Sequence, residues 1–96
     1  MTEAVRVARV RVRGRVQGVG YRAWTADVAA ELALDGWVRN RTDGSVEAQF
    51  AGAPDAVAMM LERCCNGPRA ARVTEVSIEE EGGAPPEAGF IIARTA

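Results

Sequence analysis

Apolar residues alternate with arginine along the first part of the chain. From Ala8 to Val16 most even positions are apolar, and arginine fills positions 9, 11, 13 and 15. A period of two is typical of a strand with one buried face. We expect the arginines on its solvated face or at the rim of an anion site, with a nucleic-acid-binding face as the alternative.

Two later segments repeat at helical spacing instead. Positions 25, 28, 29 and 32 predict a helix from about Arg22 to Ala33, with Trp24 packed in the core. Positions 57, 60, 61 and 64 predict a second helix, which opens at Pro54-Asp55 and stops at Asn66-Gly67-Pro68. This spacing makes Cys64 a core residue and leaves Cys65 nearer the surface.

Further strands are predicted at residues 37–40, 45–51, 73–79 and 90–94, with Asp43-Gly44 as a hairpin turn between the first two. In the strand at 73–79 we expect Val76 and Ile78 to point inward, and the glutamates at 79–81 to form a solvated strand end. Residues 1–96 are therefore expected to form a single α+β domain. Its predicted fold is a ferredoxin-like split βαβ sandwich (βαββαβ), an antiparallel sheet with two helices on one face.

The topology carries a prediction about the site. In a βαβ unit the two strands run parallel, so their carboxyl ends lie at the same edge of the sheet. The first strand ends in a glycine-rich loop and the second ends at Asn40. We therefore expect these two segments to meet, even with the third strand between them.

Composition excludes several kinds of chemistry. All 12 basic residues are arginine and the chain has no histidine. Schiff-base lysines, histidine acid–base catalysis and histidine-ligated metals are therefore ruled out. The net charge of −1 gives no general attraction to nucleic acid or to anionic membranes. We expect neither partner, and no metal or cofactor.

The remaining features concern the cellular setting. The two cysteines are adjacent, which is typical of reduced thiols rather than of a disulfide framework. Met1 to Ala4 lack the basic and apolar regions of a secretion signal, and no apolar run is long enough to span a bilayer. We expect a cytoplasmic monomer.

The glycine-rich stretch from Gly14 to Arg22 carries the candidate chemistry. Glycines at 14, 18 and 20 allow tight turns and close approach of backbone amides to a ligand. A loop that enters a helix N-terminus favours anions, and Arg22 adds a forked donor suited to phosphate. The alternative is a plain strand-to-helix turn with Arg22 in solvent. The spacing matches neither a Walker loop nor a dinucleotide-binding loop.

This stretch, GRVQGVGYR, resembles the first signature of the acylphosphatase family. A second stretch, GWVRN at 36–40 followed by Asp43-Gly44 and Val46-Glu47, resembles the other signature of that family in order and distance. With Gly67-Pro68, the resemblance covers nearly the whole chain. One departure is Ala33, where the family usually has a glycine suited to a left-handed helix C-cap.

The resemblance implies that Arg22 binds the substrate phosphate and that Asn40 orients the attacking water. The phosphate-binding loop that it implies consists of Arg15, Val16, Gln17, Gly18, Val19, Gly20 and Tyr21. The chemistry agrees, because a carboxylate leaves an acyl phosphate without protonation and the Asn40 amide has both a donor and an acceptor. The expected reaction is metal-independent hydrolysis of an acyl phosphate, with inorganic phosphate as product and inhibitor.

Two other functions stay open on sequence alone. A non-catalytic anion- or nucleotide-binding module can have the same ferredoxin-like fold, because fold does not determine function. In that case Asn40 is a hydrogen-bonding residue at a strand end. The arginine row could instead bind nucleic acid, although no aromatic residue interleaves it.

Overall fold

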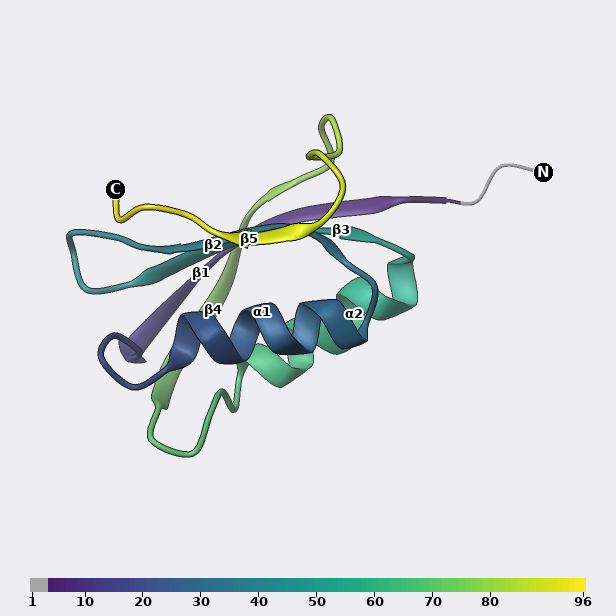
Figure 1. Cartoon of the computed structure of the whole chain (residues 1–96). Coiled ribbons are helices and arrows are strands. Elements are labelled where there is room, and N and C mark those ends of the chain that lie inside the picture. Colours follow the sequence, from purple (N-terminus) through teal and green to yellow (C-terminus); the bar gives the residue numbers. More distant parts are fainter. Residues whose placement is uncertain (1–3) are drawn as a thin grey trace.

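A computed structural model describes residues 4–96 (Figure 1), so the expectation for the first three residues lies outside the described part. The elements follow the predicted order, with the short extra strand last. They are β1 (Arg6–Arg15), α1 (Tyr21–Glu31), β2 (Asp35–Asn40), β3 (Val46–Gly52), α2 (Pro54–Cys64), β4 (Arg72–Glu81) and β5 (Phe90–Ile92).

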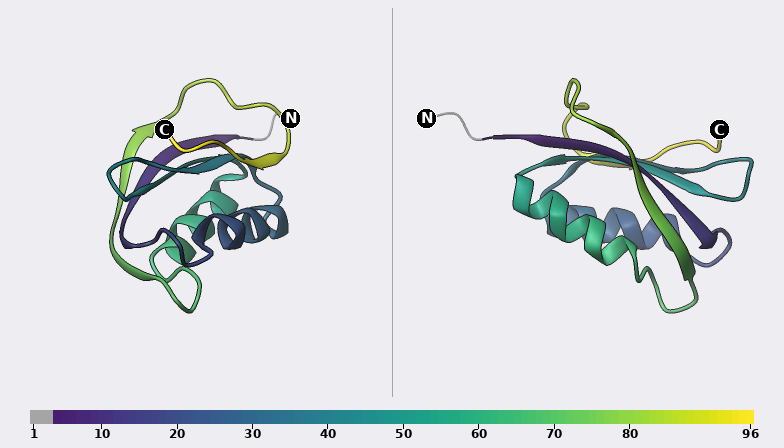
Figure 2. Two further views of the ribbon diagram at one scale, coloured as in Figure 1. Left: turned by 60° about the vertical axis from the view of Figure 1, so that its left-hand side comes forward. Right: turned by 180° about the vertical axis from the view of Figure 1, so that it is seen from behind.

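The strands form one sheet in the order β4-β1-β3-β2-β5. The pairs β4–β1, β1–β3 and β3–β2 are antiparallel, whereas β5 pairs with β2 in parallel. The prediction of an antiparallel sheet is therefore wrong at this edge, and the sheet is mixed. The loop after β4 reverses the chain and crosses to the far edge (Figure 2), so β5 runs opposite to β4 and in the direction of β2.

Both helices cover one face of the sheet, which confirms the predicted ferredoxin-like arrangement (Figure 1). The core lies between the helices and this face. Side chains that are at most 1% exposed include Val10, Val12, Phe50, Val57 and Met60. Apolar burial of this kind is the main stabilising contribution in a domain of this size.

The end of α1 confirms the expectation for Ala33. The helix stops at Glu31, and Ala33 has φ 56, in the left-handed region. Leu34 donates its amide to the Ala29 carbonyl (2.9 Å) and Ala33 to the Ala30 carbonyl (3.1 Å), which is a Schellman ending. A β-carbon is unfavourable in this conformation, so the cap has a cost that glycine would avoid.

The first three arginines of the row, Arg9, Arg11 and Arg13, lie on the face that the helices leave open, where they form an ion-pair network. Arg9 contacts Glu47 (2.8 Å) and Glu79 (3.0 Å), and Arg11 contacts Glu79 (3.3 Å). Arg9, Arg11 and Arg13 thus face carboxylates rather than a phosphate site. Glu79 and Glu81 pair with arginines as well, so the three glutamates are not simply a solvated strand end.

The prediction that Ile78 points inward is wrong. Its side chain is 47% exposed, whereas Val76 is partly buried against the core. β4 is an edge strand with a single neighbour, and its second half rises away from both helices (Figure 1). Alternation along a strand identifies one common face, but it does not show how far a helix covers that face.

Candidate active site

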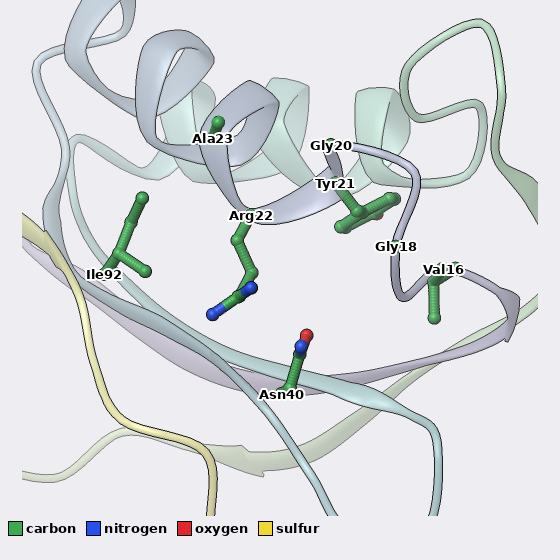
Figure 3. A pocket seen from close by; sticks show the side chains of 8 residues that line it. All are labelled: Val16, Gly18, Gly20, Tyr21, Arg22, Ala23, Asn40 and Ile92. Carbon is green, nitrogen blue, oxygen red and sulfur yellow. The ribbon is translucent and has the colours of Figure 1, made fainter.

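The carboxyl ends of β1 and β2 lie at the same edge of the sheet, and a pocket of about 240 Å³ opens there. Arg22, in the first turn of α1, and Asn40, the last residue of β2, both line it. Their side chains point toward one another across the pocket (Figure 3). The other lining residues are Val16, Gly18, Gly20, Tyr21, Ala23 and Ile92.

The loop between β1 and α1 presents an N-terminal helix end to this pocket. Gly18 (φ 73) and Gly20 (φ 81) both adopt left-handed conformations, and Gly20 is the N-cap of α1. The amides of a first helical turn have no partners within the helix. No acidic residue lies in the first turn of α1, so these amides and the helix dipole favour an anion.

Arg22 is available to such an anion. Within residues 4–96 no carboxylate lies within ion-pair distance of its guanidinium. Most other arginines in this part of the chain are paired with carboxylates: Arg6, Arg9, Arg11, Arg13, Arg39, Arg41 and Arg63. Arg22 therefore faces the pocket with an uncompensated charge and a fork of free donors.

Asn40 presents an unpaired acceptor to the same pocket. Its Oδ1 atom is buried and has no hydrogen-bond partner among the described residues. Its backbone is fixed, because the Asn40 carbonyl accepts the amide of Ala96 (3.0 Å) and Asn40 pairs with Val46 in the sheet. A buried acceptor without a partner is costly, so this atom is suited to a donor that arrives with a ligand or a water.

The structure divides the predicted phosphate-binding loop. Val16, Gly18, Gly20 and Tyr21 line the pocket, whereas Arg15, Gln17 and Val19 are not among its lining residues. Val19 packs against the core. Arg15 lies in a separate hollow beside the start of β4.

Gln17 has a different place in the site. Its Nε2 donates to the carbonyls of Arg41 and Ser45, both at 2.8 Å. These carbonyls flank the turn between β2 and β3, directly after Asn40. Gln17 thus ties the glycine loop to the hairpin that carries Asn40, a contact that sequence spacing does not reveal.

Tyr21 lies at the base of the loop with its side chain in the core. It is 2% exposed, and its hydroxyl donates to the Cys64 carbonyl at 2.8 Å. Burial raises the pKa of the phenol, so Tyr21 stays protonated and neutral. Burial likewise raises the pKa of the Cys64 thiol to about 12, which leaves Cys64 without nucleophilic thiolate at neutral pH. Tyr21 therefore anchors the loop to α2.

A buried carboxylate behind Asn40 was not singled out by sequence reasoning. Glu47 is only 3% exposed and accepts hydrogen bonds from Arg39 (2.8 Å) and Arg41 (3.1 Å). These arginines flank Asn40 in the chain, so they point to the open face while Asn40 points to the pocket. The sequence did contain a signal for this ion pair: in the predicted hairpin, Arg39 and Arg41 alternate with Asn40 on one strand, and Glu47 follows Val46 on the other.

Within residues 4–96 no group of three histidine, cysteine or acidic side chains could hold a metal ion. In the same part of the chain, no helix has the length and apolar content needed to cross a membrane.

Comparisons with known proteins identify the family of this chain. The model of the acylphosphatase family matches residues 8–92. The acylphosphatase of Rhodopseudomonas palustris is 60% identical over 76 residues, covering 79% of this chain and 77% of that protein. The acylphosphatase of Rhizobium meliloti is 51% identical, with 98% and 99% covered. The structure of an acylphosphatase from Coxiella burnetii superposes with a TM-score of 0.88 at 34% identity, covering 93% of each chain. On these matches, the chain belongs to the acylphosphatase family.

Proposed function

We propose that this protein hydrolyses the carboxyl–phosphate bond of acyl phosphates, releasing a carboxylate and inorganic phosphate. The observation that carries the proposal is the pairing of two unsatisfied groups in one pocket. The guanidinium of Arg22 has no ion-pair partner within residues 4–96, and the buried Oδ1 of Asn40 has no hydrogen-bond partner there. One group suits the phosphate and the other suits a water.

The phosphate is held by charge and by directed donors. In the proposed complex, Arg22 donates to two phosphate oxygens, and amides of the loop at Gly18–Gly20 and of the first turn of α1 bind the third non-bridging oxygen. These groups also face the charge that spreads over the equatorial oxygens as the bond breaks. The other predicted loop members act indirectly, Gln17 through the hairpin and Tyr21 through α2.

The attacking water is positioned by Asn40. Its Oδ1 accepts a hydrogen bond from the water, whose oxygen attacks phosphorus opposite the acyl oxygen. The new P–O bond forms as the bond to the acyl oxygen breaks with its electron pair, and the water proton passes to phosphate oxygen or to solvent. The carboxylate leaves unprotonated, so no general acid, metal or cofactor is required.

The proposal extends to the substrate, the oligomeric state and the cellular compartment of the enzyme. The substrate is a small acyl phosphate, and the product phosphate is expected to compete with it for Arg22 and the loop. We propose a monomer with a single domain. Cys64 and Cys65 are free thiols, which supports a reducing cytoplasmic compartment.

The test compares Asn40→Ala with the unmodified protein in acetyl phosphate turnover and in phosphate binding. Since Asn40 contacts only the attacking water, kcat should fall by about a hundredfold or more while the inhibition constant of phosphate stays within about twofold. Weakened phosphate binding with kcat preserved would make Asn40 a phosphate ligand instead. Phosphate binding by the unmodified protein without turnover would favour the alternative, a non-catalytic anion-binding module.

A further inference from the structure

A second arginine-lined hollow lies where β1 ends beside the start of β4. It has a volume of about 470 Å³, and its lining residues are Arg15, Arg69, Ala70, Ala71 and Arg72. β4 lies on the opposite side of β1 from β3 and β2. The hollow is thus separate from the pocket that contains Arg22 and Asn40.

The charges in this hollow are not compensated. Arg15 and Arg72 are directly opposite one another in the β1–β4 ladder, where like charges are unfavourable. Within residues 4–96, neither they nor Arg69 forms an ion pair with a carboxylate. All three arginines are exposed, so a dissolved anion can reach their unpaired charges.

The backbone holds these arginines in place. A shift in the β1–β4 register lies between Arg13 and Gly14, so Arg13 still contacts Glu75 (3.3 Å) whereas Arg15 faces Arg72. Gly14 has φ 123, and a β-carbon there would lie 2.1 Å from the Arg72 carbonyl oxygen. Only glycine therefore permits the close approach of the two strands that brings Arg15 to Arg72.

The short turn before β4 completes the cluster. Ala71 donates its amide to the Pro68 carbonyl at 3.0 Å, which closes a turn around Arg69. The two residues between Arg69 and Arg72 are alanines, whose small side chains also line the hollow. They also introduce no acidic side chain that could compete for the arginines.

We propose that this hollow is a second anion site, which binds a phosphate-type polyanion. Arginine forks match phosphate oxygens in pairs, and three of them suit several phosphate oxygens at once. The hollow is about twice the volume of the first pocket, 470 against 240 Å³, so it can accept more than one phosphate group. A linear polyphosphate chain satisfies both the charge and the size.

The experiment is a titration of the full chain with inorganic tripolyphosphate, followed by amide chemical shifts in two-dimensional NMR. We expect saturable shifts at residues 69–73. In the double variant Arg69→Gln/Arg72→Gln the dissociation constant should rise by about tenfold or more. The control variant Arg6→Gln/Arg63→Gln removes the same charge from two exposed ion pairs elsewhere, and it should bind within about twofold of the unmodified protein.

A parallel titration of Arg22→Lys, in which phosphate binding in the first pocket is expected to be weakened, identifies the source of the anion. An unchanged dissociation constant from the shifts at residues 69–73 assigns the hollow to a free polyphosphate, and a raised one assigns it to the distal group of a molecule that also occupies the first pocket. Shifts confined to residues 18–22, or equal affinity in both double variants, would overturn the proposal. Turnover of acetyl phosphate is not part of this readout, so the result is independent of the proposed activity.

Discussion

Replacing Glu47 by glutamine tests whether this buried carboxylate, on the central strand β3, holds the neighbouring strands β1 and β2 together. Glu47 is 3% exposed and lies within 4 Å of four guanidinium groups, those of Arg9, Arg11, Arg39 and Arg41. Glutamine keeps the size of the side chain but removes its charge. It also turns an amide N–H₂ toward donors, so at least one guanidinium loses its acceptor.

The expected loss of stability follows from this burial. Removing one partner of a buried ion pair costs about 3–5 kcal/mol. Here Arg9, Arg39 and Arg41 are 30–31% exposed and can turn partly to water, so we expect about 2–3 kcal/mol. For a domain of about 100 residues this corresponds to a fall in Tm of about 8–24 °C. The matched control is Glu80→Gln, whose carboxylate is 61% exposed and 3.7 Å from Arg9, with an expected change below about 0.5 kcal/mol.

The pH dependence provides a second readout. Burial by itself would raise the pKa of Glu47, but hydrogen bonds from Arg39 and Arg9 and the nearby positive charges lower it overall. A carboxylate with a lowered pKa in the folded state stabilises the fold above its unfolded pKa of about 4.3. This contribution is lost as the pH falls through the folded value.

The assay is urea unfolding of the unmodified protein, Glu47→Gln and Glu80→Gln between pH 3 and pH 8. The gap in unfolding free energy between the unmodified protein and Glu47→Gln should be constant above about pH 5.5 and should shrink below about pH 4. A Tm for Glu47→Gln equal to that of Glu80→Gln would refute the reasoning. So would a gap that widens as the pH falls.

Three further predictions concern the site and the α1 cap. Arg22→Lys keeps the charge but loses the fork, so most acetyl phosphate turnover and most phosphate inhibition should disappear in steady-state assays; near-normal turnover would remove Arg22 from its proposed role. Acetyl phosphate turnover should be unchanged after EDTA treatment and should not rise with added Mg²⁺, because the proposed mechanism uses no metal. Loss of turnover in EDTA that one added metal restores would contradict this mechanism. Ala33→Gly should raise the free energy of unfolding by up to about 1 kcal/mol in urea titrations, because Ala33 has φ 56, with turnover unaffected; a lower stability would show that the left-handed cap carries no strain.

Local patterns in the sequence were sufficient to predict the elements and the meeting of the two motifs. The helical stripes at Val28 and Met60 and the alternation along β1 depend only on which residues share a face of one segment. The order of these elements implied that β1 and β2 end at one edge of the sheet. That inference places Arg22 and Asn40 in a common pocket, where the structure has them.

Contacts between distant segments were decided by tertiary structure alone. Four features depend on how segments far apart in the chain pair and pack. They are the parallel pairing of β5, the exposure of Ile78, the two hydrogen bonds from Gln17 to the hairpin and the burial of Glu47. A charged residue has the same local pattern whether solvent or four arginines surround it. Likewise, the sequence names Asn40 as a residue at the end of a strand, but only the packed chain shows that its Oδ1 is buried without a partner. The physical reason is that periodicity acts within one segment, whereas burial and pairing are properties of the assembled sheet.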